Sequence, residues 1–187
     1  MGQAIDGPGR VALVSGGSRG IGAAIVRRLA ADGWDVGFSY LDDGPSAREV
    51  EKAAFELGVR AIGTDVDITD AAEVGTWFRL TEDELGPVHA VVSCAGITRE
   101  QPLARLAEAD WRTVIDTTLD GVFHLCRTAV FAMMERRSGR IVAVSSVCRN
   151  QMPTSAASVM STSVPIARTP NSKAAFSTSR ADGPSSR

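Results

Sequence analysis

A glycine-rich segment near the start of the sequence has the composition of a turn that binds phosphate. It runs from Ser15 to Gly22 and follows the apolar run Val11–Val14. Glycines let a backbone turn tightly and approach a pyrophosphate, whose negative charge is favoured at the positive N-terminus of a following helix. The alternative interpretation is a tight turn that holds no ligand. Its place between a predicted strand and a predicted helix favours nucleotide binding.

Two further polar segments directly follow apolar runs. Ser93–Gly96 comes after a run that begins at His89, and Ser145–Ser146 follows the run Ile141–Val144. Parallel strands place their carboxyl ends at one edge of a sheet, where open α/β folds bind ligands. Ser146 is therefore a candidate catalytic hydroxyl, with a plain strand-end turn as the alternative.

The elements that would position these residues alternate between apolar runs and amphipathic segments of helical length. The predicted strands are Val11–Val14, Asp35–Tyr40, Val59–Gly63, His89–Ser93 and Ile141–Val144. The predicted helices are Ile21–Ala31, Ser46–Leu57 with Ser46 as N-cap, Asp70–Leu85 and Asp110–Arg136. Five strands joined in order by helices predict an α/β protein with a doubly wound parallel sheet of the Rossmann type, in three αβα layers.

Composition and charge exclude several other classes. Hydrophobic residues at 44% and charged residues at 22% are typical of a globular domain. A net charge of −2 gives no electrostatic footprint for nucleic acid or a membrane surface. The three cysteines lack CxxC spacing, so neither a disulfide framework nor a metal site is predicted. No apolar run approaches the ~18 residues of a membrane span, and we expect a soluble cytoplasmic protein.

The pattern changes after Arg149. Residues 150–187 are rich in serine and threonine, and prolines interrupt any helix at Pro153, Pro165, Pro170 and Pro184. Such a segment buries too little apolar surface to offset the entropy of ordering it. We therefore expect a Rossmann-like domain over residues 1–149 and an irregular Ser/Thr/Pro-rich tail over residues 150–187. A frame shift, a truncation or a genuine variant would each account for the change.

The polar segments together resemble the short-chain dehydrogenase/reductase family. The motifs that carry the resemblance are Ser15–Gly22, Ser93–Gly96 and Arg140–Ser146, in the order of the family. Gly96–Arg99 and Asp110–Phe123 are most similar to 3-oxoacyl-acyl-carrier-protein reductases and acetoacetyl-CoA reductases. The resemblance implies NADPH-dependent reduction of a 3-oxoacyl thioester, carried by acyl-carrier protein or CoA, to the 3-hydroxyacyl thioester. It also implies a homodimer or homotetramer, and C-terminal strands and a lid whose pattern is missing here.

The resemblance assigns NADP(H) to the glycine-rich turn. A carboxylate at the end of the second strand would accept hydrogen bonds from a ribose 2′-hydroxyl and repel a 2′-phosphate. Tyr40 occupies that position and Arg19 lies in the turn, so the residues favour NADPH. Asp42 and Asp43 lie just beyond Tyr40 and are interpreted as a solvated turn; carboxylates that act at the ribose of the cofactor are the alternative. The expected cofactor contacts are Ser15, Gly16, Ser18, Arg19, Gly20, Ile21, Gly22, Tyr40, Asp67, Ile68, Cys94, Ala95 and Gly96.

Asp67 and Ile68 are expected at the adenine, where a carboxylate and a backbone N–H read the edge of the base. Asp65 is a rival whose spacing fits the family less well. Asp70 has a purely structural interpretation, as the N-terminal cap of the helix that follows.

The catalytic set implied by the resemblance is incomplete. It assigns the serine that holds the substrate carbonyl to Ser146, and Thr118 stands where the family has asparagine. The family's tyrosine would fall near Val159, yet the single tyrosine of the chain is Tyr40. Lys173, in a segment that faintly resembles the family's lysine motif, is a weak candidate for the catalytic lysine and otherwise a charge of the tail.

Two classes of function therefore remain open. One is the NADPH-dependent reductase, and the other is a catalytically inactive nucleotide-binding or interaction module; a non-functional fragment is a third. Arg136 and Arg137 occupy the place where similar reductases present a basic surface to an acidic carrier protein. The alternative for these two arginines is stabilisation of a helix C-terminus.

Overall fold

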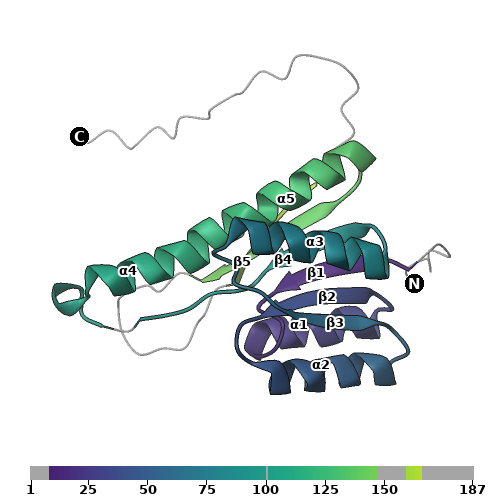
Figure 1. Ribbon diagram of the computed structural model, residues 1–187, viewed down its shortest axis with the longest axis horizontal. Coiled ribbons are helices and arrows are strands. Elements are labelled where there is room, and N and C mark those ends of the chain that lie inside the picture. The colour runs from purple at the N-terminus through teal and green to yellow at the C-terminus, as the bar shows by residue number, and fades with distance from the viewer. Residues whose placement is uncertain (1–8, 100, 147–158, 166–187) are drawn as a thin grey trace, which may run out of the picture.

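One mixed sheet forms the centre of the molecule. The computed structural model describes residues 9–99, 101–146 and 159–165. Its strands lie in the order β3-β2-β1-β4-β5-β6 (Figure 1). Their bounds are Val11–Ser15 (β1), Asp35–Tyr40 (β2), Ala61–Asp65 (β3), Val88–Ser93 (β4), Arg140–Ser146 (β5) and Val159–Pro165 (β6). β1 to β5 are parallel, and the strand order reverses between β1 and β4, which is where open α/β sheets bind ligands.

Helices cover both faces of this sheet. α1 (Gly20–Ala31) and α2 (Gly44–Glu56) lie on one face, below the sheet in Figure 1. α3 (Ala71–Leu85) and α5 (Gly121–Arg136) lie on the opposite face. This confirms the doubly wound, three-layer α/β fold predicted from the sequence.

Each face of the sheet has its own apolar core. Under α3 and α5, the buried side chains include Leu13, Trp77 and Leu125. Under α1 and α2 they include Val26, Phe38 and Val50. β1 is buried along its whole length and supplies both cores, because its alternate side chains point to opposite faces.

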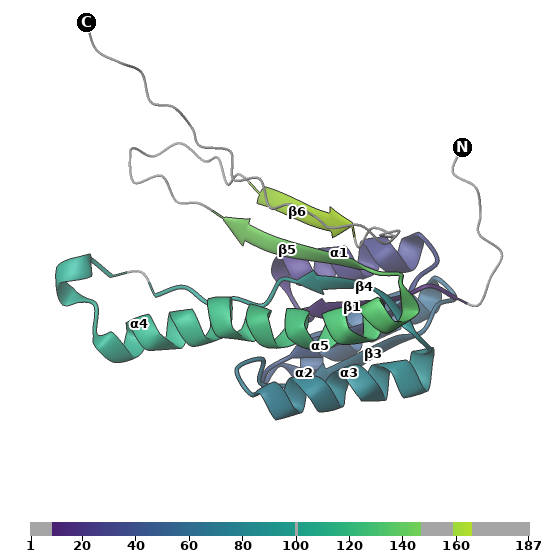
Figure 2. The ribbon, with the colours of Figure 1, turned by 90° about the horizontal axis from the view of Figure 1, so that it is seen from above.

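A long helical arm extends beyond the sheet. It begins with a 3₁₀ turn, Leu103–Arg105, continues through α4 (Glu108–Ile115) and a π-helical segment, Asp116–Asp120, and runs into α5. Figure 2 shows α4 projecting past the carboxyl ends of the strands. None of the residues of α4 is buried. The sequence predicted a single helix over Asp110–Arg136. The observed helical stretch begins two residues earlier, at Glu108, and contains a π segment.

Two predicted boundaries are wrong by two residues. α2 begins at Gly44 with Asp43 as its N-cap, so Ser46 is not the cap; Pro45 in the first turn explains the earlier start, since proline is favoured there. β3 covers Ala61–Asp65 instead of Val59–Gly63, because Asp35 at the start of β2 holds the backbone N–H of Arg60 and fixes the register.

The structure also differs from the expected irregular tail in one segment. Val159–Pro165 forms β6 and pairs antiparallel with β5, from Ser146 opposite Val159 to Arg140 opposite Pro165. The β-branched residues Val159, Thr162 and Val164 favour such pairing, and proline is tolerated at the end of an edge strand. A domain boundary at Arg149 stays a prediction. Within the described residues, no helix is long and apolar enough to span a membrane.

Candidate functional site

The glycine-rich turn joins β1 to α1 at the carboxyl edge of the sheet. Gly16 has a φ of 68°, and a Cβ there would stand 2.8 Å from Cα of Ala95. Only glycine therefore fits between the turn and the segment after β4. Gly22 is buried in the first turn of α1, where a Cβ would strike the carbonyl oxygen of Gly16.

The N-terminus of α1 suits an anionic ligand. Arg19 is its N-cap residue, and no side chain caps the first turn. The first N–H groups of a helix lack partners within the helix, so those near Ile21 are available to an anion. A Cβ at Gly20 would meet nothing within 4 Å, so the space beside this backbone is open. These features fit a pyrophosphate at the positions expected from the sequence.

A buried serine fixes the turn to the neighbouring strand. The hydroxyl oxygen of Ser15, at 0% exposure, accepts hydrogen bonds from the backbone N–H groups of Cys94 (3.0 Å) and Ala95 (3.1 Å). The two polar segments predicted to form one site are therefore in contact. Burial raises the pKa of the Cys94 thiol above its ordinary value, so this side chain is a neutral thiol at pH 7.

The loop after β2 lies against the turn. The Ser18 hydroxyl donates a hydrogen bond of 3.4 Å to the carboxylate of Asp43, the N-cap residue of α2. Tyr40 is half-buried and packs against the core under α1 and α2. The sequence suggested that Asp43 belongs to a solvated turn. In the structure Asp43 is instead the N-cap residue of α2, and its carboxylate contacts the glycine-rich turn.

The segment after β3 contains the expected adenine contacts. Oδ1 of Asp67 accepts hydrogen bonds from the N–H (2.9 Å) and hydroxyl (2.7 Å) of Thr69, which orients the carboxylate in a local turn. Ile68 is buried in the core under α5, so its backbone is the part left for a base. Asp70 caps α3 by accepting from Ala72 and Glu73, which confirms the structural alternative. The rival Asp65 is exposed and accepts from the backbone of Asp42.

Thr118 stands on the far side of the site, in the π segment between α4 and α5. A Cβ at Gly96 would lie 3.6 Å from its methyl carbon, so the arm and the segment after β4 are neighbours here. The Thr118 hydroxyl donates to the carbonyl of Val114 at 2.6 Å. With its proton engaged, this hydroxyl can accept a hydrogen bond from a water molecule but not donate one.

Two predicted catalytic side chains lie outside the described atoms. Ser146 ends β5 at the carboxyl edge of the sheet, in line with the site, but its side chain is not among the described atoms. Lys173 lies outside the described residues. The single tyrosine, Tyr40, lies at the end of β2.

A family assignment follows from comparison with known proteins. A sequence profile of the short chain dehydrogenase family matches residues 10–163. The chain belongs to this family. Within the short-chain dehydrogenases it is 38% identical over 138 residues to an acetoacetyl-CoA reductase of Paracoccus denitrificans. It is 37% identical over 139 residues to the 3-oxoacyl-acyl-carrier-protein reductase of Escherichia coli K12.

These matches cover 74% of this short-chain dehydrogenase and 55% of each relative, so the chain spans about half the length of the curated relatives it matches. Solved structures agree with the fold. A short-chain dehydrogenase/reductase of Serratia marcescens superposes with a TM-score of 0.71 at 32% identity, covering 78% of this chain and 59% of that one. An actinorhodin polyketide ketoreductase solved with NADPH gives 0.70 at 34% identity, covering 74% and 53%.

Two charged residues of this short-chain dehydrogenase lie near the glycine-rich turn and the end of β2, and the sequence analysis did not include them among the expected cofactor contacts. Asp43 was assigned to a turn, and Arg48, one helical turn into α2, was not considered. Two features of the sequence could have indicated these residues. Asp43 stands directly before a helix whose first turn contains proline, and Arg48 follows Gly44 by four residues, so it lies on the same face of the helix.

Proposed function

We propose that this chain binds NADP(H) through the turn Ser15–Gly22 and belongs to a reductase acting on a 3-oxoacyl thioester. The observation that carries the proposal is the double hydrogen bond from Cys94 and Ala95 to Ser15, because it joins the phosphate-binding turn to the segment beside Thr118. Identity to acetoacetyl-CoA and 3-oxoacyl-acyl-carrier-protein reductases supports the substrate class. The NADPH held by the actinorhodin ketoreductase supports the cofactor.

In this proposal some residues bind the cofactor and others polarise the carbonyl group of the substrate. The open N–H groups at the start of α1 would hold the pyrophosphate, and Asp67 with the backbone of Ile68 would hold the adenine. The cofactor supplies a hydride to the substrate carbonyl. Ser146, at the carboxyl end of β5, would polarise that carbonyl as a hydrogen-bond donor, and Thr118 would accept a hydrogen bond from a nearby water molecule. The product is a 3-hydroxyacyl thioester.

The family's proton donor, a tyrosine expected near Val159, is missing from this sequence. The only tyrosine is Tyr40, on β2, and a serine or threonine hydroxyl is far less acidic than a phenol of pKa ~10. Loss of a positioned general acid typically costs a factor of ~10²–10⁴ in rate. We therefore expect this polypeptide to reduce acetoacetyl thioesters at least ~10²-fold more slowly than a relative that has the family's tyrosine, while still binding NADPH.

The test is oxidation of NADPH with acetoacetyl-CoA, followed by its absorbance, in the wild type and in Ser146→Ala. Slow turnover that Ser146→Ala lowers further would support the reductase. Turnover near the ~10 s⁻¹ typical of enzymes would contradict the expected loss, and would show that another residue, such as Lys173, supplies the proton.

The second candidate function is nucleotide binding without catalysis. The placement of the single tyrosine on β2 favours it, because the site then keeps its phosphate turn and lacks its acid. NADPH binding with no detectable turnover, unchanged by Ser146→Ala, would select this function over the reductase.

A further inference from the structure

The start of α2 carries an arginine back toward the ribose side of the candidate cofactor site. Nη1 of Arg48 lies 3.4 Å from the point where a Cβ on Gly44 would stand, and the hydroxyl of Tyr40 lies 3.9 Å from the same point. Arg48 therefore reaches back over the first turn of α2 to the end of β2. Glycine at position 44 leaves this path open.

Arg48 is also free to bind an anion. The ion pairs of the described residues use Arg28, Arg60, Arg99 and Arg136, and none of them involves Arg48. Its side chain is exposed. A guanidinium donates parallel hydrogen bonds that match the geometry of phosphate oxygens, and it keeps its charge at every physiological pH.

Asp43, the residue directly before Gly44, carries a negative charge that is opposite to the charge of Arg48. Ser18 of the glycine-rich turn donates to it at 3.4 Å, so the carboxylate lies between the turn and the start of α2. A carboxylate in such a position accepts hydrogen bonds from ribose hydroxyls and repels a phosphate. Asp43 thus favours NAD(H) and Arg48 favours NADP(H), and both lie next to Gly44 at the start of α2.

We propose that Arg48 and Asp43 form an opposed pair that decides between the two nicotinamide cofactors. Arg48 binds the 2′-phosphate of NADP(H), and Asp43 accepts from the 2′-hydroxyl of NAD(H). The proposal rests on the proposed function, since it concerns the same site. It explains how a site with a carboxylate beside the ribose accommodates a 2′-phosphate, with Arg48 supplying compensating charge in addition to Arg19.

The test measures binding, not turnover. The full chain is titrated with NADPH and NADH by fluorescence, and 2′,5′-ADP and 5′-AMP are used as competitors. Arg48→Ala is expected to weaken NADPH and 2′,5′-ADP about tenfold, the effect of one exposed charge-assisted hydrogen bond, and to leave NADH and 5′-AMP unchanged. Asp43→Asn is expected to strengthen NADPH and weaken NADH.

Two variants control for general effects of charge and folding. Lys52→Ala removes a cation one turn further along the same helix and is expected to change neither affinity. Arg48→Lys keeps the charge and is expected to retain part of the preference for NADPH, because an ammonium lacks the planar fork. Far-UV circular dichroism checks that each variant is folded.

The outcomes separate this proposal from the proposed function. If the wild type binds neither nucleotide, both fail. If it binds NADPH but Arg48→Ala lowers the affinities for NADPH and NADH equally, or changes neither, the proposed function stands and the role of Arg48 is overturned. An equal loss in Lys52→Ala would likewise overturn it, by showing an unspecific effect of net charge.

Discussion

Single side-chain oxygens fix the backbone segments that surround the candidate site. Ser15 and Asp67 are buried or half-buried acceptors that fix neighbouring backbone. Sequence reasoning identified both as site residues, because each follows an apolar run at the spacing of a known motif. It could not assign Asp43, since only the fold shows that the loop after β2 returns to Ser18. A contact between loops that follow different strands depends on the tertiary structure, and a local sequence pattern does not reveal it.

Ser15 offers a test at this scale. Ser15→Ala removes the acceptor of two backbone N–H groups, those of Cys94 and Ala95, in a position with 0% exposure. A buried donor left without a partner costs ~1–3 kcal/mol, so we expect the free energy of unfolding to fall by about 2 kcal/mol or more. Urea unfolding followed by circular dichroism measures it. Ser46→Ala, a half-buried serine with no hydrogen bond among the described atoms, should change stability by less than ~0.5 kcal/mol; an equal loss there would refute the assignment.

Arg19 is the second test at the scale of one residue. Its place at the N-cap of α1, exposed and beside the open backbone of Gly20, supports a contact with the 2′-phosphate. Arg19→Ala is expected to reduce the preference for NADPH over NADH by about tenfold. Comparing the two dissociation constants by fluorescence titration decides it, and an unchanged preference would remove Arg19 from the subsite.

At the scale of elements, apolar runs predicted the strands well and the long helix less well. β2 has the predicted bounds, because its alternation and flanking turns are local signals. The π segment was not predicted. In it the hydroxyls of Thr117 and Thr118 donate to the carbonyls of Thr113 and Val114, four residues earlier. Such hydrogen bonds compete with the backbone ladder, but a threonine in a helix does not by itself indicate that it makes them.

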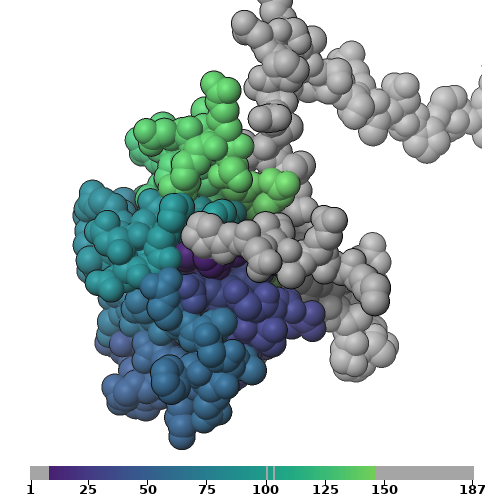
Figure 3. Space-filling view, turned by 90° about the vertical axis from the view of Figure 1, so that its right-hand side faces the viewer, coloured from purple at the N-terminus to yellow at the C-terminus, as the bar shows by residue number. Residues whose placement is uncertain are grey.

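Arg136 has a structural role in this fold; the sequence had left open whether it contacts a carrier protein or stabilises a helix C-terminus. It forms an ion pair of 2.7 Å with Glu82 of α3 and donates to the carbonyl of Val88, and Glu82 in turn accepts from the N–H of Val88. This network joins α3, α5 and β4 at the end of the molecule that Figure 3 faces, where α5 (green) borders α3 (teal). Arg137, which ends α5, is left as the candidate for carrier-protein contact.

Arg136→Ala therefore tests packing between helices. Its side chain is 31% exposed and that of Glu82 is 24% exposed, so the substitution leaves a partly buried carboxylate unpaired. We expect a loss of about 1–2 kcal/mol in the free energy of unfolding. Arg28→Ala breaks the much more exposed pair with Asp32 and should cost less than ~0.5 kcal/mol. Equal effects of the two substitutions in urea unfolding would contradict a special role for Arg136.

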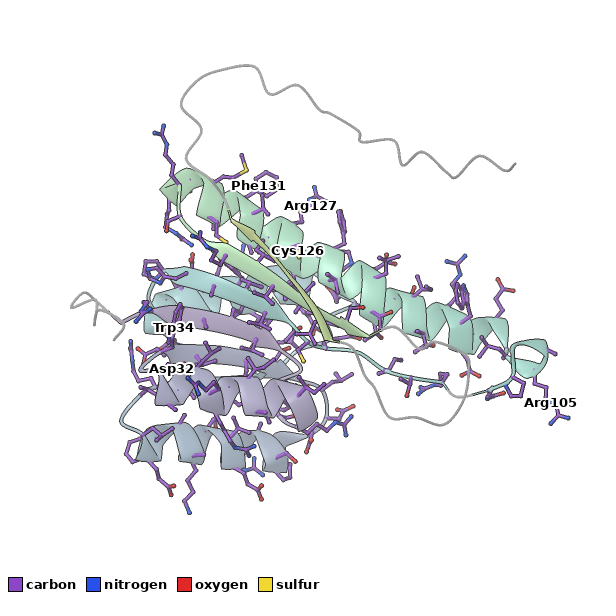
Figure 4. The ribbon with its side chains drawn as sticks, turned by 180° about the vertical axis from the view of Figure 1, so that it is seen from behind. Asp32, Trp34, Arg105, Cys126, Arg127 and Phe131 are labelled. Atoms are coloured by element: carbon purple, nitrogen blue, oxygen red, sulfur yellow. The ribbon has the colours of Figure 1, made fainter. Side chains whose placement is uncertain are left out.

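At the scale of the whole molecule, one apolar surface stands out. Large exposed apolar side chains occur along the arm and α5, at Trp111, Leu119, Phe123, Phe131 and Met134. Figure 4 shows Arg127 and Phe131 on the side of α5 that faces away from the strands. Exposed apolar surfaces of this extent typically mark protein interfaces. The resemblance to short-chain reductases implies a homodimer or homotetramer, which would cover such a surface.

A weak dimer is therefore the expected state, without a stable tetramer. A dimer with two-fold symmetry would bring the same surface of two copies together and remove its phenylalanines from water. Each buried phenylalanine contributes about 2 kcal/mol, so Phe131→Glu should weaken association by at least ~10-fold. Phe55→Glu is the matched control, because Phe55 is 80% exposed on α2, on the opposite face of the sheet. Sedimentation equilibrium of the three proteins decides the matter. A tight tetramer, a strict monomer, or an equal effect of Phe55→Glu would each contradict an interface on α5, whereas a concentration-dependent dimer lost only in Phe131→Glu would assign it.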